Sequence, residues 1–190
     1  MNVLISGGSK NGKTAFAERA ALALAGSASC GKRYYVATMI PYDDEDRKRV
    51  ELHIEERAGL GFTTLEIARN IASALDLVKE DGADPAASTF LVDSTTALLL
   101  NEMYPGDYSA PADPMAAERC RRGLAGLARG AGNAVFVSDY IYSDAARYDD
   151  FTERYRADLA SIDRALAEIC DTVIELSCGL AVVHKGGLPQ

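Results

Sequence analysis

The chain of 190 residues has no tryptophan, only two histidines and only four cysteines. Its cysteines show no Cys-x-x-Cys pair or other metal-type spacing, which disfavours a zinc site and favours reduced thiols in a cytoplasmic protein. No apolar run approaches the roughly 20 residues that span a bilayer, so we expect no membrane insertion. Basic residues are outnumbered, 20 against 28 acidic ones, and the formal net charge of -8 disfavours a nucleic-acid partner.

The rest of the composition suits one compact α/β domain over residues 1–190, because 48% of the residues are hydrophobic. Short runs rich in Val, Ile, Leu and Tyr alternate with longer segments of helical period. This alternation is typical of a mostly parallel sheet flanked by helices. Six strands are predicted, the last two as a C-terminal hairpin, over residues 2–6, 33–37, 89–93, 134–138, 172–176 and 180–184. Six helices are predicted over residues 12–25, 44–57, 68–79, 95–103, 114–128 and 149–169.

The first predicted strand leads into the segment GGSKNGKT and then into an alanine-rich helix. Strand, glycine-rich loop and helix in this order are the context of a Walker A motif, or P-loop. Its backbone N–H groups turn toward phosphate oxygens, Lys13 reaches the β- and γ-phosphates, and Thr14 offers its hydroxyl to Mg²⁺. The pattern predicts a P-loop NTPase-like fold that binds ATP or GTP through Gly7, Gly8, Ser9, Lys10, Asn11, Gly12, Lys13 and Thr14.

An acidic residue closes the third predicted strand, FLVD. A P-loop enzyme needs such a carboxylate to hold Mg²⁺ or its water, so Asp93 is predicted to be a metal ligand together with Thr14. Aspartate is also favoured as the cap of a following helix. Both roles remain open for Asp93, and they are compatible.

The helix predicted over residues 44–57 contains His53, one of the two histidines. Arg49 and Arg57 stand four residues to either side of it, so the three residues share one helix face. Two guanidinium groups beside an imidazole suit phosphate binding and nucleophilic catalysis. A lone histidine flanked by charged residues is more often a solvated helix position. Spacing alone leaves both interpretations open.

The motifs follow one another as GGxxxGKT, YxAT, DDE, RVxxH, an arginine four residues later, and aromatic-x-Thr-x-Glu. In this sequence they occupy residues 7–14, 35–38, 43–45, 49–53, 57 and 62–66. Asp93 with the two threonines after it, and Arg156 in the last helix, extend the match over nearly the whole chain. This order resembles the adenosylcobinamide kinase and adenosylcobinamide-phosphate guanylyltransferase family of cobalamin biosynthesis.

The resemblance implies a bifunctional enzyme with a corrinoid and a nucleoside triphosphate as its partners. It would phosphorylate the aminopropanol hydroxyl of adenosylcobinamide and then pass GMP from GTP to that phosphate. His53 would carry GMP as a phosphoramidate, with Lys13 and Asp93 as the other catalytic residues. The resemblance also implies a homo-oligomer whose active sites are assembled between subunits. Besides the P-loop, the residues expected to contact nucleotide are Thr38, Arg49, Arg57 and Glu66.

Two segments depart from the family pattern. The family reads Asn-Glu-Val-Gly where this chain has DYIY at residues 139–142, and Gly-x-x-Asn-Gln where it has SIDR at residues 161–164. Both strings are expected to border the nucleotide or corrinoid pocket. Two other functions therefore remain open: a monofunctional P-loop kinase for another small hydroxylated metabolite, and a non-catalytic GTP-binding regulatory protein.

Overall fold

A computed structural model describes residues 1–26, 31–106, 110–142 and 145–189. Within one helix, the side chains of Glu45, Asp46, Arg49, Leu52, His53 and Glu56 also lie outside the description. The predictions for the Arg49 and His53 side chains therefore concern groups outside the described part of the chain.

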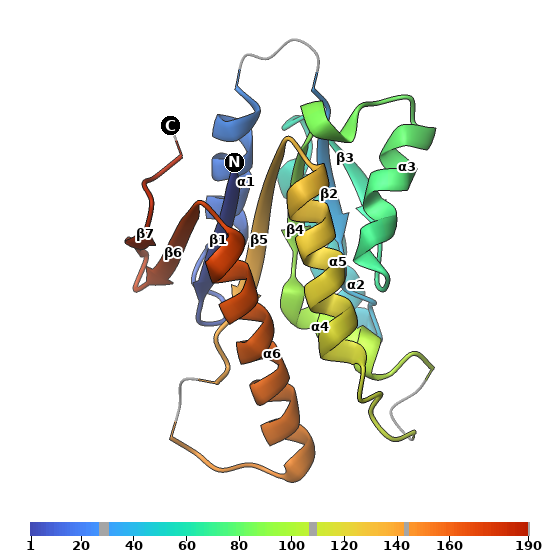
Figure 1. The fold of residues 1–190 in the computed structure, drawn as a ribbon, viewed down its shortest axis with the longest axis vertical. Helices are drawn as coiled ribbons and strands as arrows, with labels where there is room; N and C mark the ends of the chain where they lie inside the picture. Colours follow the sequence, from blue (N-terminus) through green and yellow to red (C-terminus); the bar gives the residue numbers. More distant parts are fainter. Residues whose placement is uncertain (27–30, 107–109, 143–144, 190) are drawn as a thin grey trace.

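In the described ranges, seven strands form a single sheet (Figure 1). The strands are β1 (Asn2–Gly7), β2 (Arg33–Ala37), β3 (Phe62–Glu66), β4 (Thr89–Asp93), β5 (Asn133–Asp139), β6 (Thr172–Ser177) and β7 (Leu180–Lys185). Across the sheet their order is β3-β2-β4-β5-β1-β6-β7, and every neighbouring pair is parallel except the antiparallel β6-β7 hairpin. The carboxyl ends of the parallel strands consequently meet at one edge, at the lower end of the sheet in Figure 1.

Helices connect the strands and cover both faces of the sheet. They are α1 (Lys13–Ala25), α2 (Asp44–Arg57), α3 (Ala74–Glu80), α4 (Thr95–Met103), α5 (Ala116–Gly130) and α6 (Asp150–Ile169), with short 3₁₀ turns η1 (Ile71–Ser73) and η2 (Pro85–Ala87). Leu4 and Phe136 face the core under α4, α5 and α6, whereas Ile5 and Val135 face the core under α1. Strands buried on both faces read as continuous apolar runs, and this explains why most of them were predictable.

The α/β class and the C-terminal hairpin are confirmed, and the predicted strand limits hold to within one residue. Positive φ angles at Cys178 and Gly179 form the two-residue loop of the hairpin. Cys120 and Cys170 are buried free thiols, Cys178 is an exposed one, and Cys30 lies outside the described residues. None of the helices in the described ranges is both long enough and apolar enough to cross a bilayer.

Several predicted limits were wrong, among them those of the helix predicted over 114–128, which covers Ala116–Gly130. Strand β3 was not predicted, because it lies at the sheet edge and its half-exposed sequence FTTLE lacks a continuous apolar run. The helix predicted over 68–79 begins only at Ala74, after a 3₁₀ turn, since Asn70 adopts a left-handed φ of 52° that interrupts a helix. Gly12, at φ 86°, precedes α1 rather than belonging to it.

The difference in burial between two leucines predicts very different costs for the same substitution. Leu124→Ala in α5 removes a side chain with 0% exposure, so we expect the free energy of unfolding to fall by about 2–5 kcal/mol. Leu180→Ala in β7 changes a side chain that is 71% exposed and should leave that free energy within about 0.5 kcal/mol. Urea unfolding followed by circular dichroism measures both, and equal losses would contradict the assigned core.

Candidate active site at the P-loop

The P-loop is fixed to the neighbouring strand β6 by one close contact. The Asn11 side chain donates its Nδ2 proton to the Leu176 carbonyl oxygen at 2.6 Å. Gly7 lies between these groups, and a Cβ atom there would come within 2.6 Å of the same oxygen. Lys10 and Gly12 have positive φ, which turns the loop back on itself before α1 begins. The loop therefore has the shape that directs successive N–H groups to an anion.

Lys13 already has two partners in the described structure. Its ammonium donates to the Gly8 carbonyl oxygen at 2.6 Å and lies 2.7 Å from Asp139 Oδ1. The lysine is 7% exposed, and Asp139 stands at the carboxyl end of β5, in register with Gly7. A triphosphate that binds the loop must share or replace the Asp139 contact, because both anions compete for one ammonium group.

Asp93 connects three elements at the carboxyl edge of the sheet. Its Oδ2 accepts hydrogen bonds from Thr14 Oγ1 at 2.9 Å and from the Tyr35 hydroxyl at 2.7 Å. The cap of α4 is the next residue, Ser94, whose Oγ accepts from the Ala97 N–H. Asp93 thus faces the P-loop threonine and leaves the capping role to its neighbour.

The donor set around Thr14 fits Mg²⁺. One hydroxyl and one carboxylate lie within hydrogen-bonding distance, and both offer the oxygen ligands that this ion prefers. Within the described ranges, no three His, Cys, Asp or Glu side chains gather as a metal site. Sparse protein ligation suits Mg²⁺, which is usually bound by one or two carboxylates together with substrate phosphates and water.

Arg57 joins helix α2 to the same cluster. Its guanidinium carbon lies 3.6 Å from the centre of the Tyr35 ring, and the side chain is 8% exposed. A cation over an aromatic face is held by the ring quadrupole. Burial, followed by the charge of Asp93, raises the pKa of Tyr35 well above its usual value, so the phenol stays protonated and keeps its bond to Asp93.

Thr38 and Glu66 occupy different positions along the same edge. The Thr38 side chain is fully buried, and its hydroxyl both donates to the Ser94 carbonyl and accepts from the Ser94 N–H at 2.7 Å. It therefore positions the backbone just after Asp93. Glu66 is exposed at the end of β3, four strands from β1, or roughly 19 Å across the sheet. Glu66 therefore does not contact the P-loop. A nucleotide contact for Thr38 or for Glu66 stays a prediction.

Two acidic residues near the P-loop were missed as site residues. No role was predicted for Asp139 beyond its place in residues 139–142, although it ends the strand beside β1 and pairs with Lys13. Glu18 is buried in α1 one turn after Thr14, and its charge contributes to the raised pKa of Tyr35. Its i+4 spacing from Thr14 was the available signal. Asp139 offered no signal in the local sequence, because the strand order was unknown.

Residues 139–142 and 161–164, the two segments expected to depart from the family pattern, contact each other. Asp163 in α6 accepts hydrogen bonds at Oδ2 from Ser138 Oγ and from the Tyr142 hydroxyl, both at 2.8 Å. Asp163 is 5% exposed, and burial raises its pKa to about 6 against the opposing effect of these hydrogen bonds. Residues 139–142 and 161–164 thus form one connected structure beside the P-loop.

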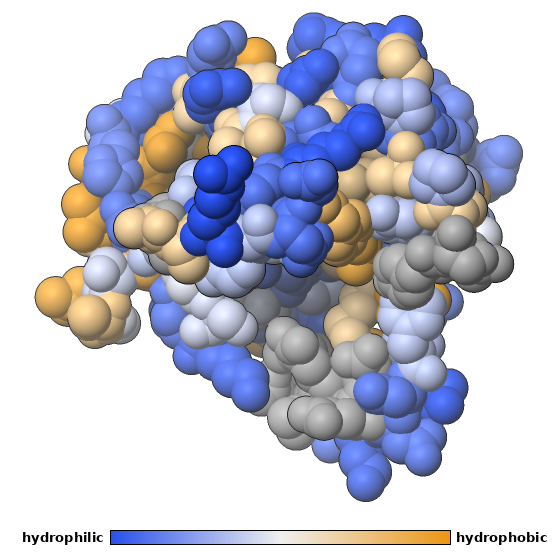
Figure 2. Space-filling view, turned by 90° about the horizontal axis from the view of Figure 1, so that it is seen from below, coloured by the Kyte–Doolittle hydropathy of each residue, from blue (hydrophilic) through white to orange (hydrophobic). Residues whose placement is uncertain are grey.

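The carboxyl edge, seen from below in Figure 2, is mostly hydrophilic.

A family model described as cobinamide kinase / cobinamide phosphate guanyltransferase matches residues 3–183. Among solved structures, a KaiC-like protein from the archaeon Pyrococcus horikoshii OT3 is similar, with 15% identity and a TM-score of 0.53 over 97% of this chain and 78% of that one. A second protein of that organism, known from a structural study, has 11% identity and a TM-score of 0.52 over 97% and 86% of the two chains. Identities this low concern the fold alone. No curated protein matches the sequence.

The close approach at Gly7 predicts a difference between two neighbouring glycines. Gly7→Ala places a methyl group against the Leu176 carbonyl, which is backbone and cannot rotate away, so unfolding should become easier by about 1–3 kcal/mol. Gly8→Ala meets no atom within 4 Å and should leave the free energy of unfolding nearly unchanged. Thermal unfolding of the two variants distinguishes them, and equal melting temperatures would contradict the anchored loop.

Asp163 predicts a dependence of stability on pH. Because its pKa is higher in the folded chain than its usual value near 3.9, the folded state binds more protons between about pH 4 and pH 6. The free energy of unfolding should therefore decrease as the pH rises through this window, by at most roughly 3 kcal/mol. Asp163→Asn keeps the acceptor oxygen and should remove this component. Urea titrations at several pH values test it, and identical slopes in both proteins would refute it.

Proposed function

This chain belongs to the cobinamide kinase / cobinamide phosphate guanyltransferase family, and we propose that it carries out both reactions of that description. It phosphorylates adenosylcobinamide with ATP or GTP, and it then transfers GMP from GTP to adenosylcobinamide phosphate through a histidyl-GMP intermediate on His53. Family membership over residues 3–183 supports the general assignment to cobalamin biosynthesis. The histidine intermediate and the identity of the corrinoid are the proposed parts.

One observation carries the proposal: helix α2 is attached to Thr14 and Asp93, the proposed magnesium ligands. Thr14 bonds Asp93, Asp93 bonds Tyr35, and the Arg57 guanidinium lies on the Tyr35 ring. His53 is four residues before Arg57 in α2. Its Cα therefore lies about 6 Å from the Arg57 Cα along the helix axis, toward the amino end of the helix. A histidine on this helix is thereby tied to the region that receives the triphosphate.

For phosphoryl transfer, the P-loop N–H groups and Lys13 hold the triphosphate, and Lys13 exchanges Asp139 for a phosphate oxygen. Thr14 and Asp93 would hold Mg²⁺, which neutralises charge on the β- and γ-phosphates when bound. The corrinoid hydroxyl oxygen attacks the γ-phosphorus. The bond between the γ-phosphorus and the β-γ bridging oxygen breaks, and a nucleoside diphosphate leaves. Asp139, released from Lys13, is the carboxylate of the site able to accept the hydroxyl proton.

For GMP transfer, the neutral imidazole of His53 attacks the α-phosphorus of GTP. A P–N bond forms, the bond to the α-β bridging oxygen breaks, and pyrophosphate leaves. An oxygen of the corrinoid phosphate then attacks the same phosphorus, the P–N bond breaks, and the imidazole is regenerated. Arg57 contributes a fixed positive charge one turn from His53, which favours the transferred phosphate.

A monofunctional P-loop kinase is the second candidate, favoured by the departures at residues 139–142 and 161–164. Labelling separates it from the preferred function. Incubation with GTP labelled at the α-phosphate, followed by denaturation, should leave an acid-labile and alkali-stable label on the chain. The expected label is lost in His53→Ala, because His53 forms the P–N bond in the proposed reaction.

His184→Ala is the matched control, since His184 is the other histidine of the chain and is half-exposed on β7. It should keep the label, whereas Lys13→Ala should lose it through weakened triphosphate binding. Label that persists in His53→Ala would refute the assigned nucleophile. Phosphorylated corrinoid without any protein label would favour the kinase alone, and tight nucleotide binding with neither reaction would favour a regulatory protein.

A further inference from the structure

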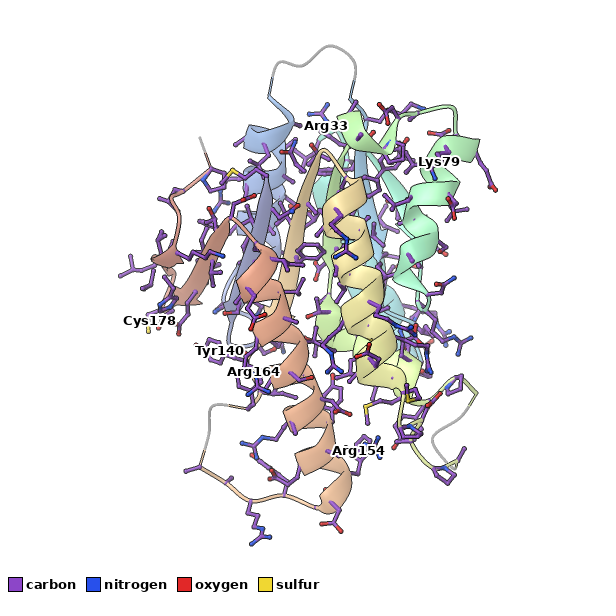
Figure 3. The ribbon with its side chains drawn as sticks, in the orientation of Figure 1. Arg33, Lys79, Tyr140, Arg154, Arg164 and Cys178 are labelled. Carbon is purple, nitrogen blue, oxygen red and sulfur yellow. The ribbon has the colours of Figure 1, made fainter. Side chains whose placement is uncertain are left out.

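A recess with a volume of about 370 Å³ opens beside the P-loop, lined by Ser6, Tyr140, Tyr142 and Glu175. Ser6 directly precedes Gly7 in β1, and the Tyr140 N–H lies 3.4 Å from the Gly7 carbonyl oxygen. Tyr140 is at the lower end of the sheet, on the carboxyl edge (Figure 3). Whatever occupies this recess is a near neighbour of the bound phosphates.

The lining favours uncharged ligands over anions. It offers three hydroxyl groups and one carboxylate, and no cationic side chain is found among the described residues that line it. Glu175 is paired at 2.9 Å with His184, which is half-exposed on the adjacent β7 strand. The carboxyl group of Asp163 lies behind the recess, bonded to the Tyr142 hydroxyl. The Glu175 carboxylate accepts hydrogen bonds from a ligand and repels phosphate, and the hydroxyl groups can accept as well as donate.

Asp163 supports the recess from behind. Its Oδ1 atom is buried and has no hydrogen-bond partner among the described residues, whereas its Oδ2 atom accepts from Tyr142. Buried polar atoms are nearly always paired, so this carboxyl can accept one further hydrogen bond at Oδ1. Tyr142, which bonds the other oxygen of this carboxyl, forms part of the recess wall.

The Tyr142–Asp163 hydrogen bond joins residues 139–142 to residues 161–164, the two segments expected to depart from the pattern of the family that the chain resembles. Tyr142 also lines the recess, so both segments bear on the same recess.

We propose that this recess is the acceptor subsite, which binds an uncharged hydrogen-bond-donating arm, a primary amide or a hydroxyl, of the substrate that receives the phosphate. The volume is at the low end for small-molecule pockets, so it holds one side arm rather than a whole macrocycle. The Tyr142 and Glu175 oxygens accept the donor protons, and Asp163 holds Tyr142 in place. The identity of the acceptor arm as a corrinoid amide rests on the proposed function.

Steady-state kinetics with adenosylcobinamide tests the subsite. Tyr142→Phe removes the phenol oxygen, and Glu175→Gln removes the charge and replaces one carboxylate oxygen with an N–H donor. Each variant should raise KM for the corrinoid about tenfold, because one hydrogen bond accepted from the ligand is lost or weakened. The dissociation constant for Mg²⁺-GTP should change less than twofold in both. Glu175 is one-third exposed, so Glu175→Gln tests the recess without disturbing the buried core.

Tyr148→Phe is the matched control, since it removes a phenol outside the recess and keeps the ring beneath Arg156. Its KM for the corrinoid should equal that of the parent protein. An unchanged corrinoid KM in both recess variants overturns the subsite. A parallel loss of GTP affinity also overturns it, because that result assigns the residues to the shape of the P-loop.

A second measurement does not depend on the corrinoid. The protein is labelled with 3-fluorotyrosine and saturated with Mg²⁺ and a non-hydrolysable GTP analogue, and the Tyr140 and Tyr142 signals are assigned with Phe variants. Acetamide or 1,2-propanediol should shift both ¹⁹F signals, whereas added inorganic phosphate should not. Donor-selective shifts without corrinoid turnover sustain the recess and refute the proposed substrate. Turnover without such shifts, or shifts with phosphate, refutes the recess.

Discussion

The hydrogen bonds accepted by the Asp93 carboxylate hold the candidate active site together. One oxygen receives both the Thr14 hydroxyl and the Tyr35 hydroxyl, so the P-loop helix, β4 and β2 meet at one atom. The Arg57 guanidinium lies over the face of the Tyr35 ring, and this contact joins helix α2 to the same cluster. A carboxylate accepts several hydrogen bonds at low cost in strain, which suits it to this central position. Thr38 then holds the backbone behind it through Ser94.

A second carboxylate, Asp139, stands on the other side of Lys13 and gives the site its resting electrostatics. The ammonium is nearly buried and needs an anion nearby, and Asp139 provides one at 2.7 Å. A bound triphosphate brings more negative charge to the same ammonium, so nucleotide binding and release of Asp139 are coupled. Asp139 also directly precedes Tyr140, so the residue that pairs with Lys13 adjoins the wall of the proposed acceptor subsite.

The divergent segments are physically one unit. Residues 139–142 and 161–164 are separated in the sequence by the first half of α6 and the segment before it, yet Ser138 and Tyr142 both bond Asp163. Substitution at one position changes the hydrogen-bonding needs of the other, because a buried carboxyl must find donors. The departures from the family pattern are therefore coherent, and they leave the P-loop and Asp93 in place.

The sequence by itself determined the P-loop, the α/β class and the carboxylate at the end of β4, because each depends on local patterns. Continuous apolar runs marked the buried strands, and the Walker A spacing marked the loop. The exposed edge strand β3 lacked such a run and was missed. Only the tertiary structure decided that Asp139 meets Lys13, that Arg57 lies on Tyr35, and that Tyr142 reaches Asp163. These contacts depend on strand order and on distant segments meeting at one edge of the sheet, and no local spacing encodes that order.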